Sequence, residues 1–232
     1  MDAGSTSVNG LPGSPAQYRK RDFWSQENQK YATRHYRLEK SAKLISKVAA
    51  GRSSALLDLG CGPAALRDAL PGNIRYHGID IAIQEPAPYL MERDFVEEPI
   101  SFAGRHFDIV LAQGVFEYMG GCEAQKLSEI ASLLNDGGTF IVSYVNFSHR
   151  NARIYPIYNN IQRPDQFHES LSRYFEVSKV IPVSHNWPHS DPHRYLIKKA
   201  NMYFNFTIPF VSNKLAVEHY YVCSPVQPHG AR

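Results

Sequence analysis

The sequence predicts an α/β fold built on a largely parallel sheet. The first observation is a series of short apolar runs with the composition of buried strands, at 55–59, 74–80, 107–113 and 139–144. The second is that helical or turn-rich segments separate these runs, the clearest being an amphipathic stretch at 123–134. Strands that alternate with such segments are typical of βαβ units, whose strands run parallel.

Length, composition and charge set the broad class. A chain of 232 residues with 43% apolar content can bury a full-sized core and is most simply one domain, expected over 17–232. Residues 1–16 are rich in Gly, Ser, Pro and Asn and are expected to form a disordered tail. A formal charge of +3, without a dense basic stripe, gives no reason to expect nucleic acid as a partner.

Cysteine usage and hydropathy indicate the compartment. Cys61, Cys122 and Cys223 are far apart and lack paired spacing, so neither a disulfide framework nor a thiolate zinc site is expected. No apolar run is long enough to cross a bilayer, and the first residues lack the hydrophobic segment of a signal peptide. These features favour a reducing cytoplasm.

Residues 22–50 are rich in helix formers and predict two helical pieces. In the later piece Leu38, Ala42 and Ile45 share one face, and Gly51 can end the helix. The earlier piece carries a heavy aromatic load that comprises Phe23, Trp24, Tyr31, His35 and Tyr36.

The most informative stretch is the strand at 55–59 and the turn after it. Gly60 and Gly62 let the backbone turn tightly, and Pro63 suits a first helical position, so a ligand can approach bare backbone here. The turn also fits the loose G-x-G-x-x-G/A dinucleotide fingerprint, with an acid at the expected distance in Asp80. Asp58 argues against a nicotinamide cofactor, because its carboxylate would repel pyrophosphate and attract an ammonium group. No Gly-Lys-Ser/Thr sequence follows, so the turn is not a P-loop.

The segment Leu57-Asp58-Leu59-Gly60-Cys61-Gly62 closely resembles the first motif of class I S-adenosylmethionine-dependent methyltransferases, and the resemblance continues from Leu56 to Ser143. It implies a Rossmann-like, doubly wound seven-stranded sheet, mostly parallel with an antiparallel last strand, in an α/β/α sandwich. It also implies S-adenosylmethionine as cofactor and S-adenosylhomocysteine as product. Because an N-terminal helix often covers the cofactor in such enzymes, 22–50 is a candidate lid. Aromatic packing onto the sheet edge explains its composition equally well.

The resemblance assigns cofactor contacts along the first half of the chain. A short helix is expected at 64–70 and the second strand at 74–80, so that Asp80 meets the ribose hydroxyls and Ile81 packs on adenine. A helix should precede the third strand at 92–95, whose Asp94 would meet the adenine amino group or, alternatively, cap the next turn. The expected cofactor residues are Asp58, Gly60, Cys61, Gly62, Asp80, Ile81, Asp94, Phe95 and Gln113.

The reacting methyl group should lie beyond the fourth strand, 107–113. Gln113 would face the methionine part, and Phe116, Glu117 and Tyr118 would lie near the methyl, although Phe116 suits the core equally well. The helix at 123–134, its Asn-Asp-Gly-Gly turn and the fifth strand at 139–144 complete the resemblance.

Beyond Tyr144 the resemblance fades, and acceptor specificity is expected there. A helix at 166–174 and strands at 175–180 and 218–223 enclose 184–214, which is much longer than a usual connection and is the expected substrate-binding insertion. Its histidines recur every four residues, but Pro188 and Pro192 interrupt a helical metal face, so no metal site is predicted. The expected acceptor contacts are Tyr31, Tyr36, Phe116, Tyr118, Asn146, Arg150, Trp187 and Tyr203.

Methyl transfer from a sulfonium is a direct displacement that positioning and desolvation can largely catalyse, whereas a hydroxyl acceptor usually benefits from a base. The candidate bases are His185, His189, His193, His149 and Glu117. The sequence thus predicts a methyltransferase acting on a hydroxyl or amine of a small molecule such as a sugar, glycan precursor or secondary metabolite. The alternatives are a non-catalytic S-adenosylmethionine-binding regulatory or scaffolding protein and an enzyme with a protein acceptor. The absence of an Asn/Asp-Pro-Pro-Tyr/Phe sequence after 107–113 disfavours amide- or adenine-directed methylation, and oligomeric state stays open.

Overall fold

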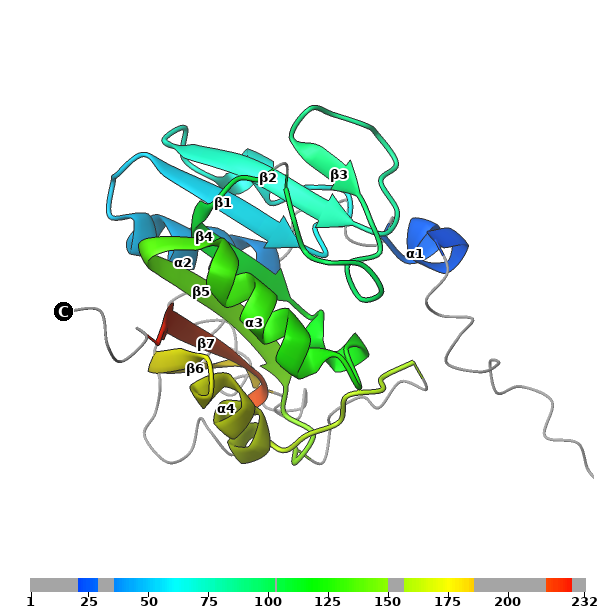
Figure 1. Ribbon diagram of the computed structural model, residues 1–232, viewed down its shortest axis with the longest axis vertical. Helices are drawn as coiled ribbons and strands as arrows, with labels where there is room; N and C mark the ends of the chain where they lie inside the picture. The colour runs from blue at the N-terminus through cyan, green and yellow to red at the C-terminus, as the bar shows by residue number, and fades with distance from the viewer. Residues whose placement is uncertain (1–20, 29–35, 103, 150–156, 186–215, 227–232) are drawn as a thin grey trace, which may run out of the picture.

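The computed structural model describes residues 21–28, 36–102, 104–149, 157–185 and 216–226. Their strands form one seven-stranded sheet in the order β3-β2-β1-β4-β5-β7-β6 (Figure 1). Neighbours from β3 to β5 pair in parallel, whereas β7 is antiparallel to both β5 and β6. The predicted sheet is confirmed, with the bounds β1 Ser54–Leu59, β2 Ile74–Asp80, β3 Leu90–Glu92, β4 Phe107–Gln113, β5 Leu134–Val145, β6 Phe175–His185 and β7 Ala216–Pro225.

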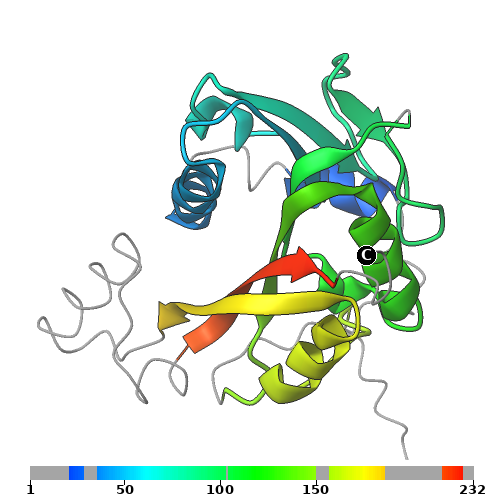
Figure 2. The same cartoon turned by 60° about the vertical axis from the view of Figure 1, so that its left-hand side comes forward.

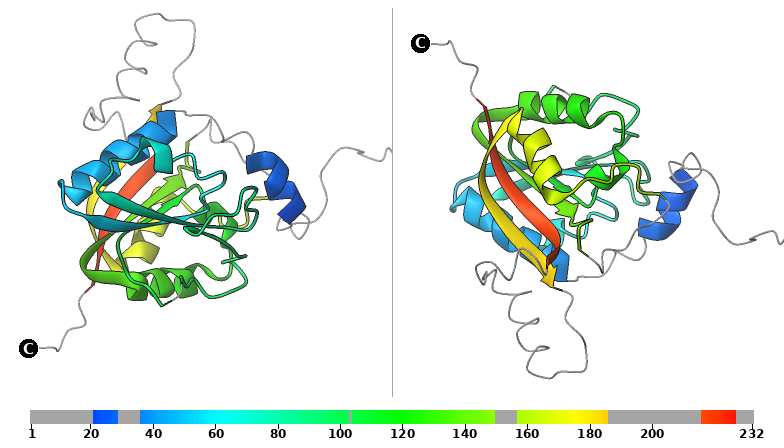
Figure 3. Two further views of the ribbon diagram at one scale, coloured as in Figure 1. Left: turned by 90° about the horizontal axis from the view of Figure 1, so that it is seen from above. Right: turned by 90° about the horizontal axis from the view of Figure 1, so that it is seen from below.

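Helices cover both faces of this sheet, and α2 and α3 lie on opposite sides of it (Figure 3). The two helical pieces predicted within 22–50 are present, as are those predicted near 123–134 and 166–174. The described helices are α1 Arg21–Asn28, α2 Tyr36–Ala49, α3 Glu123–Leu133 and α4 Pro164–Ser172, with the 3-10 turns η3 Arg67–Ala69 and η4 Phe116–Tyr118.

The two-sided core follows from the strand period of two. In β1, Leu57 and Leu59 point into a cluster under α3 and α4, whereas Leu56 points into a second cluster under α2. Every residue of β1 is buried, because helices cover both faces of an interior parallel strand.

Two expected helices are absent, and each has a local cause. The segment predicted as a helix over 64–70 contains only η3, because Ala64 has a left-handed φ of 56° that a right-handed helix cannot contain. The expected helix before the third strand is irregular at 81–89, where Pro86 and Pro88 remove backbone donors. Strand β3 spans Leu90–Glu92 and not the predicted 92–95, so Asp94 follows the strand instead of ending it.

The connection between β6 and β7 starts and ends at the carboxyl edge of the parallel strands. His185 at the end of β6 pairs with Ala216 at the start of β7, and Val145 at the end of β5 pairs with Glu218. The two antiparallel strands run side by side (Figure 2). The predicted insertion, 184–214, lies outside the described residues except for 184–185, but both of its attachment points are at this edge.

We expect Phe167→Ala to destabilise the fold by about 3–5 kcal/mol, because the fully buried Phe167 ring stacks on Tyr144 at 3.9 Å and joins α4 to the sheet. Unfolding in urea measures this loss. Ile161→Ala is the control, since Ile161 is 51% exposed, and its effect should stay within about 0.5 kcal/mol. Equal effects of the two changes would contradict the packing role.

Candidate functional site

The turn after β1 is folded back onto the end of β2. The amides of Gly60 and Cys61 both donate to the carbonyl oxygen of Ile79, at 2.8 and 3.2 Å. Gly60 has φ of 71°, and a Cβ on it would come within 2.6 Å of Val115 Cγ2. Only glycine fits this position, so the predicted bare-backbone turn exists because there is no room for a side chain.

Asp58 places a buried carboxylate beside this turn. The Tyr76 hydroxyl donates to its Oδ2 at 2.8 Å. Burial raises the pKa of Asp58 to about 7, the Asp80 charge adds to the rise, and the Tyr76 hydrogen bond opposes it. Within the described ranges no basic side chain forms an ion pair with Asp58. A ligand ammonium group would supply the missing positive charge, so the site fits a cationic amino acid.

Asp80 ties the end of β2 to the glycine turn. Its Oδ2 accepts the Gly62 amide at 2.8 Å, and its Oδ1 accepts the Ala82 amide at 2.9 Å. A carboxylate offers about four acceptor positions, so these two amides do not by themselves exclude a ribose hydroxyl. The half-buried Ile81 lies directly after it. The structure thus brings together Asp58, Gly62 and Asp80 at the ends of neighbouring strands, as predicted.

Cys61 contributes packing at this turn. The residue is buried, and a Cβ on Gly78 would meet its Sγ at 2.7 Å, so the sulfur fills the space above that glycine. Burial raises the pKa of the thiol well above its ordinary value. The side chain is therefore a neutral wall of the site.

Asp94 occupies the turn after β3. Its Oδ1 accepts the Val96 amide at 3.1 Å, which is the capping role that the sequence left open. Its Oδ2 makes no hydrogen bond to the described residues and is available to an adenine amino group. The neighbouring Phe95 is buried in the core and anchors the turn.

Gln113 joins the sheet to α2. Its Oε1 accepts the Ser41 hydroxyl at 3.1 Å, and its Nε2 donates to the Tyr220 hydroxyl. Beside it Arg37 pairs with Glu218 at 2.7 Å and lies over Gly114, where a Cβ would meet Arg37 Nη2 at 3.0 Å. Sequence reasoning missed this pair, since its members lie 181 positions apart and neither belongs to a motif.

Phe116 and Tyr118, both predicted to lie near the methyl group, have different environments in η4. Phe116 is fully buried and packs on Phe140 and Phe167, so its environment is the core that the sequence allowed as an alternative. Tyr118 is half-buried and makes an edge-on contact with Trp24 and a tilted contact with Tyr158, at ring-centroid distances of 5.1 and 5.2 Å.

Helix α1 lies between the end of β3 and η4. At one end Arg21 pairs with Glu92 at 2.8 Å, and Gln84 donates to the Ser25 carbonyl oxygen at 2.7 Å. Close to these contacts, the Trp24 ring touches the Tyr118 ring of η4. This placement agrees with a lid over the carboxyl edge, and its aromatic contacts also agree with packing onto that edge.

Two of the candidate bases are buried. Glu117 is 1% exposed, and its Oε1 accepts the Val145 amide at 2.9 Å, whereas its Oε2 has no hydrogen-bond partner among the described residues. Burial raises the pKa of Glu117 to about 7. His149 is buried after β5. Nearby, the Asn146 side chain donates to the Ala216 carbonyl oxygen at 2.9 Å, which holds the start of β7.

The other predicted side chains are not described. His185 ends β6 and Tyr36 begins α2, but only their backbones are placed. The remaining predicted residues lie outside the described ranges, namely His189, His193, Tyr31, Arg150, Trp187 and Tyr203. The described ranges contain no group of three potential metal ligands and no helix long and apolar enough to span a membrane.

Residues 33–181, more than half of the chain, match the model of a methyltransferase domain family. The chain belongs to this family. The predicted membership of the class I S-adenosylmethionine-dependent methyltransferases is confirmed, and with it the superfamily's cofactor. No curated relative matches the sequence.

Solved structures support the same fold at low sequence identity. The CcbJ methyltransferase from Streptomyces caelestis superposes with a TM-score of 0.60 at 14% identity, covering 84% of this chain and 92% of that one. The N-methyltransferase NodS from Bradyrhizobium japonicum, in complex with S-adenosylhomocysteine, gives 0.56 at 11% identity, with 88% and 99% covered. A Haloferax volcanii methyltransferase in complex with the Trm112 activator gives 0.59 at 20% identity, with 90% and 97% covered.

We expect Gly60→Ala to weaken S-adenosylhomocysteine binding about tenfold or more, because the new Cβ would be strained at positive φ and would collide with Val115. Isothermal calorimetry measures this. Gly72→Ala is the matched control, since it has no atom within 4 Å of the new Cβ, and its affinity should equal that of the wild type. Normal binding by Gly60→Ala would refute the proposed close approach.

We expect cofactor affinity to rise with pH and to level off near pH 7, because the ligand ammonium group needs the ionised form of Asp58, whose pKa is about 7. Below that value the dissociation constant of S-adenosylhomocysteine should improve by up to about tenfold per pH unit. The same raised pKa makes the ligand-free protein lose this group's contribution to stability as pH rises from about 4 to about 7.

Calorimetry of S-adenosylhomocysteine binding between about pH 5.5 and pH 7.5, below the titration of the ligand amine, isolates this effect. Asp58→Asn should bind weakly and with a nearly flat pH profile. A flat wild-type profile would show that Asp58 is already ionised in the free protein.

Proposed function

We propose that the protein transfers the methyl group of S-adenosylmethionine to a hydroxyl or amine of a small molecule, such as a sugar, a glycan precursor or a secondary metabolite. The observation that carries this is Asp58, a buried carboxylate with no basic partner in the described ranges, beside a side-chain-free turn and one strand from Asp80. A buried charge without a partner is costly unless a ligand completes it.

The residues would hold the cofactor from end to end. Asp58 would bind the ammonium group of the methionine part, Asp80 the ribose hydroxyls, and Asp94 the adenine amino group, with Ile81 packed on the ring. Near the methionine part, Arg37 supplies a positive charge beside Gly114. The bound cofactor supplies an electrophilic methyl group on a sulfonium, and the protein holds the acceptor in line with it and excludes water.

The acceptor side is aromatic. Trp24, Tyr118, Tyr158 and Phe147 are half-buried and form a continuous series of ring contacts near the ends of β4 and β5. Such rings provide apolar contact area for an acceptor that enters beside the methyl group. Because α1 lies between the end of β3 and η4, the arrangement favours a small acceptor over a folded protein.

The candidate bases are histidines at or after the carboxyl ends of β5 and β6. The chain enters and leaves 186–215 at the carboxyl edge, which supports the proposal that this segment contributes acceptor contacts. We assign proton removal from a hydroxyl acceptor to His185, His189 or His193, with His149 as a further candidate. Glu117 is a weaker one, since its carboxyl group is buried and bound to Val145. All three cysteines are free thiols, which suits the proposed cytoplasmic location.

A two-stage experiment tests the proposal. Calorimetry should first show one S-adenosylhomocysteine per chain, with weaker binding by Asp80→Ala. Product formation from S-adenosylmethionine should then be screened over hydroxyl and amine compounds. No binding to the intact protein would overturn the proposal. Tight binding without turnover on small molecules, but with methylation of a protein, would favour a protein acceptor, and binding without any turnover would favour the non-catalytic alternative.

We expect Trp24→Ala to raise the KM of the acceptor about tenfold while leaving S-adenosylmethionine affinity nearly unchanged, because Trp24 packs on Tyr118 at the acceptor end. Steady-state kinetics distinguishes an effect on the acceptor KM from an effect on S-adenosylmethionine binding. Tyr174→Ala removes a half-buried ring distant in the fold, after α4, and should change neither value. An unchanged acceptor KM for Trp24→Ala would remove α1 from the acceptor site.

A further inference from the structure

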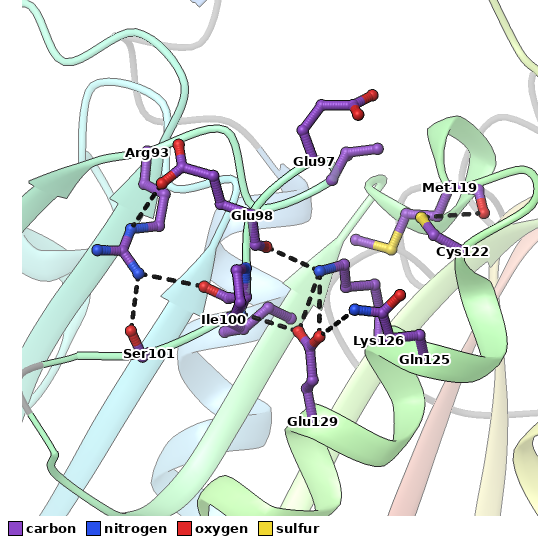
Figure 4. A network of polar contacts seen from close by, with 12 residues as sticks. Arg93, Glu97, Glu98, Ile100, Ser101, Met119, Cys122, Gln125, Lys126 and Glu129 are labelled. Atoms are coloured by element: carbon purple, nitrogen blue, oxygen red, sulfur yellow. Dashed lines mark hydrogen bonds and ion pairs between the residues drawn. The ribbon is translucent and has the colours of Figure 1, made fainter.

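A buried lysine connects α3 to the loop that follows β3. The Lys126 side chain is 1% exposed, which is rare for a charged group unless its hydrogen-bonding capacity is met. Its Nζ donates to the Glu98 carbonyl oxygen at 2.7 Å and to Glu129 Oε2 at 3.0 Å (Figure 4). The ammonium group therefore joins its own helix to the loop backbone.

Glu129 makes a second connection between the same helix and the same loop. Its Oε2 also accepts the Ile100 amide at 2.9 Å, and its Oε1 accepts the Gln125 side chain at 2.7 Å. Burial raises the pKa of Glu129, but these hydrogen bonds and Lys126 outweigh burial and leave the pKa lowered. An ionised glutamate and a lysine thus hold two backbone groups, at Glu98 and Ile100.

This loop, 93–101, carries the acid expected at the adenine end of the site. It begins where the Arg93 amide donates to the Asp80 carbonyl oxygen at 2.8 Å. Arg93 crosses the loop to the Ser101 hydroxyl at 2.7 Å, and Asp94 lies between these anchors. The loop contains no described strand or helix, so its shape depends on such contacts.

We propose that Lys126 and Glu129 are positioning residues that hold the 93–101 loop so that Asp94 meets the adenine amino group. This rests on the proposed function, since it requires that the chain bind an adenosine-containing cofactor. Without the two anchors the loop must become ordered when the cofactor binds, and the conformational entropy lost in that step weakens binding. The cost should appear at the adenine end of the cofactor and not at its methionine end.

The test compares two ligands that differ only at the base. S-adenosylhomocysteine carries the adenine amino group, and S-inosylhomocysteine carries an oxygen in its place. We expect the wild type to prefer the adenine ligand, and Lys126→Met to weaken that ligand about tenfold while binding of the inosine ligand changes little. The preference between the two ligands, measured by calorimetry, should therefore collapse.

Two further variants separate positioning from stability. The double variant Lys126→Met/Glu129→Met removes both charges. Replacing a buried ion pair by apolar side chains often leaves stability intact. The double variant therefore serves as the test if Lys126→Met alone fails to fold. Leu133→Ala truncates a buried side chain on the same helix and should lower the unfolding midpoint without changing the ligand preference.

The outcomes are distinct. A wild-type preference for adenine that is retained in folded Lys126→Met or in the double variant would overturn the positioning role and leave the proposed function standing. A loss of preference in Leu133→Ala equal to that in Lys126→Met would also overturn it, because destabilisation alone would then explain the effect. Failure of the wild type to bind either ligand would instead overturn the proposed function.

Discussion

The site depends on one close approach, between the backbone of Gly60 and the side chain of Val115. A Cβ at Gly60 would lie 2.6 Å from Val115 Cγ2, so the turn after β1 can lie against the segment after β4 only because the residue is glycine. The same turn is held to β2 by the amides of Gly60 and Cys61 and by the carboxylate of Asp80. Three neighbouring strands therefore end together, and each brings one part of the site to the same edge.

This arrangement buries the Asp58 carboxylate, which by itself adds little to the stability of the fold. Asp58 is buried, its pKa is raised to about 7, and the described partner of its side chain is the Tyr76 hydroxyl. Burial of an uncompensated acid works against folding, and such costs are typical of sites whose missing partner is a ligand. Asp80 differs, since two backbone amides already stabilise its carboxylate.

Remote segments complete the edge through buried polar contacts. Helix α2 supplies Ser41 and Arg37, β7 supplies Tyr220 and Glu218, and α3 supplies Lys126 to the loop after β3. Buried polar groups need partners with definite geometry, so these contacts restrict where each element can lie. The proposed acceptor side differs, because its described contacts are between half-buried aromatic rings, whose packing is less directional than a buried polar contact.

Features that depend on local chemistry could be predicted from the amino-acid pattern. The period-two and period-3.6 patterns located the main strands and the four described α-helices, and the Asp58, Gly60 and Gly62 pattern located the tight turn after β1, because periodicity and backbone freedom are properties of short segments. The sequence prediction missed the partner of Asp58, although the strand pattern contained part of the signal. Tyr76 of β2 pairs with Leu56 of β1, so its side chain lies on the same face of the sheet as that of Asp58. The helices expected at 64–70 and before β3 failed, since the left-handed Ala64 and the prolines at 86 and 88 outweighed helix propensity.

Contacts between distant segments could be identified only once the folded chain was described. Arg37 meets Glu218 and Ser41 meets Tyr220 through side chains, and the Lys126 side chain meets the backbone carbonyl oxygen of Glu98. No local pattern distinguishes these side chains from surface residues. Tertiary packing also decided between two roles for Phe116, which belongs to the core, and for Asp94, which caps its turn while one oxygen stays available. The physical reason is that burial and partner choice are set by the whole fold, whereas sequence patterns report only the neighbourhood along the chain.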